Sequence, residues 1–335
     1  MGVRLPFLLV SSLLGSQIAS AVCVTDVASF QAALNAANGS TTAVTIKVAR
    51  GTYDLSAGRL SFESYLSNQA QVSVSGGYDH DCTGQIKNPA LTILDGGGHS
   101  ALLRLQSPAG LSVRYLTLQN GSSTDEGTAL QVYSSATIIV DYNIIRNNST
   151  STYNMIVGGI NFATGNIHVD GNLLVGNTAS GANAAGSVYT TGSGNTYVTN
   201  NTVVGNSGDP ASCAGLQIGI SGPGTGTAYA SNNIFWHNTL CGVYVSGVVL
   251  TNNDYGALGG TADPTSSGNV NVSPGFNPGA YSLAADSPLL GKAELAPPGG
   301  LPTIDIEGNP RSYDKLVDFG AYERGNFVFA DGFDD

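Results

Sequence analysis

The sequence predicts an all-β solenoid, a stack of coils that each contribute three short strands, and three observations predict it. The 335-residue chain has 45 Gly and only 10% charged residues, a composition typical of many short strands joined by tight turns. Residues 167–170 and 196–199 are examples of short runs in which polar and apolar side chains alternate, as in strands with one buried face. The pattern Asn–x–apolar–x–x–Asn recurs at spacings of 29, 29 and 32 residues, starting at Asn143, Asn172, Asn201 and Asn233.

The repeated Asn predicts how the coils stack. One coil cannot bury its own apolar face, but coils that pair with their neighbours at ~4.8 Å bury a continuous core. The first Asn of each pattern would lie at the bend between the second and third strands, directly over its counterpart in the coil before. Because a side-chain amide both donates and accepts hydrogen bonds, such a column can bond along the whole stack. We therefore assign a structural ladder, without a catalytic role, to Asn143, Asn172, Asn201 and Asn233.

The first 21 residues have the features of a secretory signal peptide. Arg4 precedes the mostly apolar stretch 7–14, and the small residues 19–21 form a cleavage site, so we expect a secreted protein. No later stretch is long and apolar enough to predict a transmembrane segment. The region 22–102 is predicted to hold a cap helix and the entry coils, and its stretch "TDVASFQAALNAA" (25–37) is an amphipathic helix with a Thr/Asp start. Strand-like sequence follows this helix.

The net charge limits the class of binding partner, and the cysteines indicate the cellular compartment. The net charge of −11 argues against nucleic acid as a partner, and an acidic polymer would need a bridging cation or local basic residues. The even number of cysteines predicts disulfides in an exported chain. Cys213 and Cys241 each lie just before a Gly that opens an equivalent strand, so they should meet on adjacent coils. Cys23 and Cys82 would then pair near the N-terminal end.

Four stretches carry resemblances to known families. "YVTNNTVVGN" and "AYASNNIFWHN" resemble the repeats of right-handed parallel β-helix proteins of the pectate-lyase-like group. "SPGFNPGAYSLAADSPLLGKAE" and "DIEGNPRSYDKLVDFGAYE" resemble the closing segment of secreted bacterial β-helix proteins of the choice-of-anchor type. The resemblance implies an N-terminal helical cap, a β-helix core over 103–258 and a closing segment over 259–324. The acidic and aromatic tail, 325–335, is either a sorting or anchoring signal or a disordered end.

One charged cluster follows from the repeat register. Two positions before the ladder residues, Arg114, Asp141 and Asp170 should point outward on consecutive coils. Two such carboxylates could bind calcium, share a proton, or act as an acid and base pair, so these three are the candidate catalytic residues. The alternative is a surface ladder of ion pairs with no chemical role. Calcium is the one cofactor that this cluster suggests.

A second row of outward residues is aromatic. His168, Tyr197 and Tyr229 lie two positions further back and are the candidate substrate-binding residues, because their rings could stack on sugars. The alternative is that Tyr is simply favoured in strands.

The resemblance implies a further surface, since in the lyase family the first strand of each coil faces the cleft. The outward residues of that row here are predicted to be Gln131, Asn161, Gln217 and Tyr244, while the register around Ser187 is ambiguous. The row is polar rather than acidic, and a calcium-dependent lyase needs several carboxylates and a base. An acidic pair in the preceding loop, residues 125–126, could contribute.

Two functions from different classes remain open. The resemblance implies a monomer that binds extracellular polysaccharide and degrades it as a lyase or hydrolase. The missing acid and base set favours instead a non-catalytic cell-surface or adhesion protein.

Overall fold

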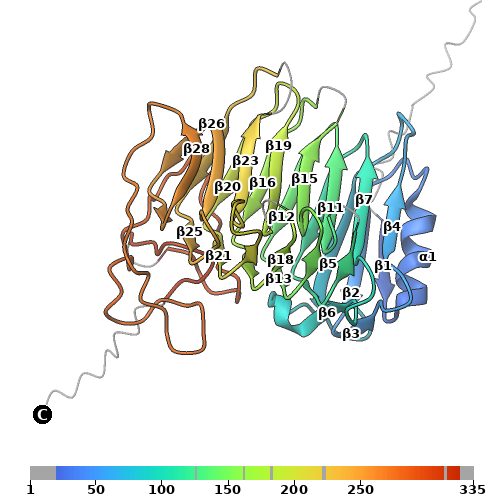
Figure 1. The fold of residues 1–335 in the computed structure, drawn as a ribbon. Helices are drawn as coiled ribbons and strands as arrows, with labels where there is room; N and C mark the ends of the chain where they lie inside the picture. Colours follow the sequence, from blue (N-terminus) through green and yellow to red (C-terminus); the bar gives the residue numbers. More distant parts are fainter. Residues whose placement is uncertain are drawn as a thin grey trace, which may run out of the picture.

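The protein is a parallel β-helix capped at its N-terminal end by a helix (Figure 1). The structure is a computed structural model that describes residues 20–124, 127–160, 163–181, 184–220, 224–312 and 315–324. Residues 1–19 of the expected signal peptide, the acidic pair at 125–126, Asn161 and the tail 325–335 lie outside the described residues. The predicted all-β fold class is confirmed.

Every full coil adds one strand to each of three parallel walls. Wall 1 consists of the first strands, and β26 continues from wall 1 into wall 2. Its strands are β4 (Leu60–Glu63), β7 (Leu103–Ser107), β11 (Leu130–Ser134), β15 (Met155–Gly159), β19 (Gly186–Thr190), β23 (Leu216–Ile220), β26 (Val243–Thr251) and β28 (Leu258–Ala262).

Wall 2 holds the second strands and includes the N-terminal strand of the described chain. Its strands, which end at β26, are β1 (Ser20–Val24), β2 (Val44–Ala49), β5 (Val72–Tyr78), β8 (Leu111–Arg114), β12 (Ile138–Asp141), β16 (Ile167–Asp170), β20 (Thr196–Thr199) and β24 (Ala228–Ser231).

Wall 3 holds the third strands, and a fourth row of two-residue strands follows it in four of the coils. The strands of wall 3 are β3 (Gly51–Asp54), β6 (Thr92–Asp95), β9 (Thr117–Gln119), β13 (Ile144–Arg146), β17 (Leu173–Val175), β21 (Thr202–Val204), β25 (Ile234–Trp236) and β27 (Asp254–Tyr255). The fourth row, which the sequence did not predict, is β10 (Ser122–Ser123), β14 (Ser149–Thr150), β18 (Thr178–Ala179) and β22 (Ser207–Gly208).

The predicted asparagine ladder is present and fully buried. The backbone N–H and Nδ2 of Asn172 both donate to Oδ1 of Asn201, at 2.9 and 3.0 Å, and the same pair of bonds recurs at each step from Asn143 to Asn253. A second ladder, at the bend after wall 3, was not predicted as such. Its members, which end the four sequence patterns, are Asn148, Asn177, Asn206 and Asn238. Both bends therefore satisfy their buried backbone groups internally.

The left-handed backbone at these bends belongs to the residue before each ladder Asn. Asn200 and Asn232 have φ of 53° and 60°, and Gly171 has φ of 64°. Asn and Gly adopt this conformation at the lowest cost, which explains the doubled Asn in the repeat. The ladder Asn itself supplies the amide and the preceding residue supplies the turn.

Helix α1 (Val27–Ala37) lies at one end of the stack (Figure 1). Asp26 caps it by accepting from the backbone N–H of Ser29 at 2.7 Å, and Ser29 returns a capping contact to the backbone of Asp26. Phe30 and Leu34 are fully buried and belong to the same apolar core as the strands. A short 3-10 helix, η1 (Pro89–Leu91), precedes β6.

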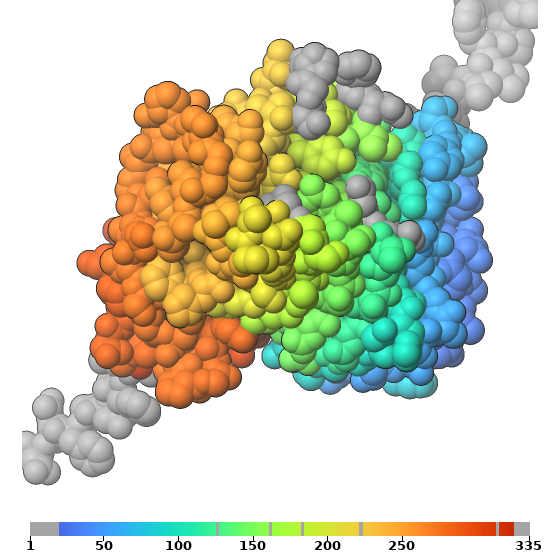
Figure 2. Space-filling view, viewed as in Figure 1, coloured from blue at the N-terminus to red at the C-terminus, as the bar shows by residue number. Residues whose placement is uncertain are grey.

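The residues after β28 fold back over the outer face of wall 3 instead of only covering the last coil. Ile306 and Ala321 pack on Leu173 and Val204. Arg311 is completely buried, donates to the carbonyls of Gly320 and Ala321, and has Glu323 3.6 Å away. In Figure 2 the orange residues, which include the last strands, make up the end of the molecule opposite the blue N-terminal coils.

Both predicted disulfides are confirmed. Cys213 and Cys241 lie on adjacent coils with their Cα atoms 4.9 Å apart, and Cys23 and Cys82 join the N-terminal coils at 5.7 Å.

Candidate functional site

The predicted charged row is in register on wall 2. Asp141 pairs with Arg114 on one side and with Asp170 on the other, so the three lie side by side on consecutive coils. Nη2 of Arg114 lies 3.1 Å from Oδ2 of Asp141, and Nδ1 of His168 lies 3.5 Å from Oδ2 of Asp170. The sequence therefore located this cluster correctly, while the role of its members is untested.

The carboxylates differ from the prediction in being largely buried. Asp141 is 7% exposed, and Oδ1 of both Asp141 and Asp170 has no hydrogen-bond partner. Burial, and next the charge of Asp170, raises the pKa of Asp141 well above its usual value, because desolvation disfavours the ionised form. Burial likewise raises the pKa of Asp170. The pair thus favours holding a proton at a pH where an ordinary carboxyl has lost it.

The aromatic stripe on wall 2 is present, but it is a poor sugar platform. The ring centroids of His168 and Tyr197 are 5.0 Å apart, and those of Tyr197 and Tyr229 are 5.6 Å apart with 10° between the planes. The ring faces are therefore turned towards one another. Gly299 of the closing segment lies against this stripe, so close that a β-carbon on it would fall 2.5 Å from Cγ of Tyr197. The sequence placed the residues correctly but did not show that the closing segment lies over Tyr197.

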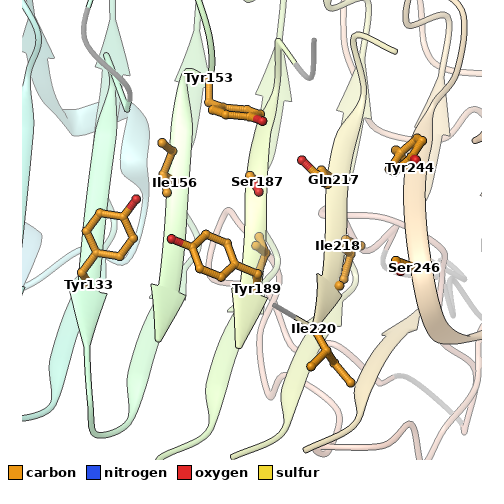
Figure 3. A pocket seen from close by; sticks show the side chains of 12 residues that line it. Tyr133, Tyr153, Ile156, Ser187, Tyr189, Gln217, Ile218, Ile220, Tyr244 and Ser246 are labelled. Carbon is orange, nitrogen blue, oxygen red and sulfur yellow. The ribbon is translucent and has the colours of Figure 1, made fainter. Parts of the chain in front are cut away.

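A groove whose lining includes four tyrosines lies instead on the outer face of wall 1 (Figure 3). One row across five strands is Gln131, Ile156, Ser187, Gln217 and Tyr244. The ambiguity at Ser187 is thereby resolved, and the position between Gln131 and Ser187 belongs to Ile156 of β15 (Met155–Gly159), while the predicted Asn161 lies outside the described residues. Ile156 faces outward because its apolar neighbours Met155 and Val157 point into the core. The sequence-based prediction assigns these inward positions to later residues.

The second row explains why the groove is hollow. Tyr133, Gly158, Tyr189, Gly219 and Ser246 are in register on the same five strands. The ring of Tyr189 leans across the strand towards Tyr133, as Figure 3 shows, and their centroids are 6.4 Å apart. A β-carbon on Gly158 would lie 2.8 Å from Cζ of Tyr189, so only Gly leaves room for this ring. Gly219 then leaves the next position in the row without a side chain.

The groove encloses a cavity of about 510 Å³ and its described lining residues carry no charge. Five strands spaced at ~4.8 Å make the floor roughly 19 Å long. Tyr, Ile, Val, Gln, Ser and Gly line it, and Tyr153 closes one side. The nearest charge in the first row is Arg104 on β7, next to Gln131, and it is paired with Glu63 at 3.0 Å. Such a surface offers ring faces and neutral hydrogen-bonding groups, and it offers no acid or base among the described residues.

Comparisons with models of protein families, with curated proteins and with solved structures find no match. Within the ranges that the structure describes, no helix is long and apolar enough to cross a membrane. The same residues contain no group of three or more His, Cys, Asp and Glu that could hold a metal ion. Calcium binding therefore stays a prediction from the sequence.

Proposed function

We propose that this is a glycan-binding protein that holds an uncharged polysaccharide along the groove on wall 1. The observation that carries the proposal is the pair of registered rows, in which half-buried Tyr133 and Tyr189 and exposed Tyr244 lie among Gln, Ser, Ile and Gly, and no charged side chain is among the described lining residues. Aromatic faces with a few hydrogen-bonding groups are suited to sugar rings, whose faces are apolar and whose edges are hydroxylated.

Charge favours a neutral glycan over a uronate polymer. The chain has a net charge of −11, and a polyanion would be repelled unless basic residues or a cation compensated. Neither basic residues nor carboxylates that could hold a bridging cation occur in the described groove lining. We propose that the protein acts outside the cell, since the two disulfides are of the kind that persists in oxidising compartments.

A second candidate function, polysaccharide cleavage, is favoured by one observation on wall 2. Asp141, beside Arg114, and Asp170, beside His168, each keep a buried carboxylate oxygen without a partner, which is unusual for purely structural ion pairs. An acid with a raised pKa is suited to protonating a leaving group. Against this candidate, the carboxylates are largely buried and lie on a different wall from the groove.

A polysaccharide panel separates the two. Glucomannan, xyloglucan and dextran represent neutral glycans, and polygalacturonate and alginate represent uronate polymers. Binding would be measured by calorimetry, and cleavage by reducing ends and by the absorbance of unsaturated uronates, with and without calcium. We expect a neutral glycan to bind without being cleaved, and Tyr189→Ala to weaken binding roughly tenfold through loss of ring stacking.

The control for the Tyr variant is Tyr229→Ala, which removes a ring from wall 2 and should leave glycan affinity unchanged. If no neutral glycan binds, the proposal is wrong. Cleavage of a uronate polymer that Asp141→Asn abolishes would establish the catalytic candidate instead.

A further inference from the structure

The groove on wall 1 continues into a second cavity of different character. Tyr153, Gln217 and Tyr244 line both the groove and this cavity, which we call the end pocket. The end pocket has a volume of about 580 Å³. Its other described lining residues are Ala211, Ser212, Cys213, Leu240, Cys241, Leu258 and Gly259. A ligand that follows the groove therefore meets a mainly apolar wall at this end.

The apolar side chains of the end pocket are exposed instead of packed. Leu240 is 60% exposed, Tyr244 is 41% exposed and Leu258 is 37% exposed. These three side chains lie around one cavity. Single exposed apolar residues are common on protein surfaces, but a cluster of them is typical of a binding site. Gly259 lies close to the ring of Tyr244, since a β-carbon there would approach Cδ2 to 2.8 Å. The ring is thereby held from one side.

Leu240 also has an unfavourable backbone conformation. Its φ is 62°, in the left-handed region, which costs a branched residue of this kind about 1–2 kcal/mol. The next residue, Cys241, is fixed by its disulfide to Cys213, so the segment that carries Leu240 is tied to the adjacent coil. Leu240 is thus both strained and exposed, and the disulfide of its neighbour Cys241 holds it in place. Residues with this combination are typical of binding sites.

We infer that the end pocket is a subsite for a small apolar substituent on the bound glycan, such as an O-acetyl group. The inference rests on the proposed function, because the ligand reaches the end pocket through the groove. The chemistry of the pocket matches an ester methyl better than a bare sugar hydroxyl: Leu240 and Leu258 offer apolar contacts, and no described lining residue is charged. The neutral groove and the apolar pocket together define an uncharged, acylated polysaccharide as the ligand class.

The test compares one glycan with and without acetyl groups. Whichever of glucomannan, xyloglucan and dextran binds most tightly is chemically O-acetylated to a low degree, and half of it is then deacetylated with mild alkali. Calorimetry gives the affinity of the whole protein for both forms. We expect the acetylated form to bind more tightly, roughly fourfold for each methyl group that is buried.

Two variants locate the preference. Leu240→Asn removes the apolar side chain but keeps a residue that tolerates the left-handed backbone, and Leu258→Ser removes the opposite contact. Each should abolish the preference for the acetylated form while leaving the affinity for the deacetylated form unchanged. Leu66→Asn is the matched control, because Leu66 is 47% exposed and lines neither the groove nor the end pocket.

The outcomes distinguish this inference from the proposed function. Equal affinity of the wild-type protein for both forms overturns the subsite and leaves the glycan groove in place. A preference that survives in both Leu240→Asn and Leu258→Ser also overturns the subsite, because the acetyl group is then recognised elsewhere. If none of the three glycans binds in either form, the proposed function fails and the inference with it.

Discussion

Replacing Asn201 by Ala tests whether the buried amide ladder holds the coils together. Asn201 is completely buried, its Nδ2 donates to the carbonyl of Val169 at 2.7 Å, and its Oδ1 accepts from the backbone N–H of Asn172 at 2.9 Å. Alanine leaves that N–H and that carbonyl buried without these partners. Each orphaned group costs about 1–3 kcal/mol, so the variant should lose about 2–6 kcal/mol of unfolding free energy.

The measurement is urea unfolding followed by far-UV circular dichroism, with Asn166→Ala as the matched control. Asn166 makes the same kind of contact, since its Oδ1 accepts from the backbone N–H of Asn195 at 3.0 Å, but it is exposed. Water can replace the lost amide there, so we expect a loss within about 0.5 kcal/mol. If the two variants lose similar amounts of unfolding free energy, burial does not determine how much the ladder contributes to stability, and the reasoning is refuted.

Four further predictions follow from the described contacts. Because the pKa of Asp141 is raised, the folded state holds more protons than the unfolded state above pH ~4. The free energy of unfolding should therefore fall as the pH rises from about 4 through neutrality. Asp141→Asn should flatten this pH dependence, which is measured by comparing urea midpoints at pH 5 and pH 8. The double variant Cys213→Ser/Cys241→Ser opens a loop of 28 residues and should lower the unfolding free energy by roughly 3.5 kcal/mol in the same assay, whereas an unchanged midpoint would show that the crosslink does not constrain the unfolded chain. Arg311→Ala leaves the carbonyls of Gly320 and Ala321 without their buried donor and should cost about 2–6 kcal/mol, seen as faster proteolysis within residues 263–324 than in the strands; uniform protection would contradict this. Gly158→Ala should displace the ring of Tyr189 and weaken glycan binding with little change in the melting temperature, while an unaltered affinity would show that the ring position is unimportant.

The sequence by itself determined the architecture, because the architecture depends on repetition. The spacing of Asn143, Asn172, Asn201 and Asn233 could be counted, and stacking in register follows once a coil needs a neighbour to bury its apolar face. The same register placed Arg114 beside Asp141 and predicted which cysteines meet. Each of these is a statement about equivalent positions on consecutive coils, which a period in the sequence fixes directly.

The tertiary structure alone decided which surfaces stay open. The closing segment folds back and places Gly299 on Tyr197, a contact between residues about a hundred positions apart that no period encodes. Burial of Asp141 likewise depends on how side chains and segments around wall 2 pack. The groove on wall 1 depends on the true start of β15 and on two glycines aligned with Tyr189, and a strand shifted by one residue would have turned every side chain to the other face. Periodicity can be counted in the sequence, whereas the accessibility of a side chain depends on which distant segments pack against it.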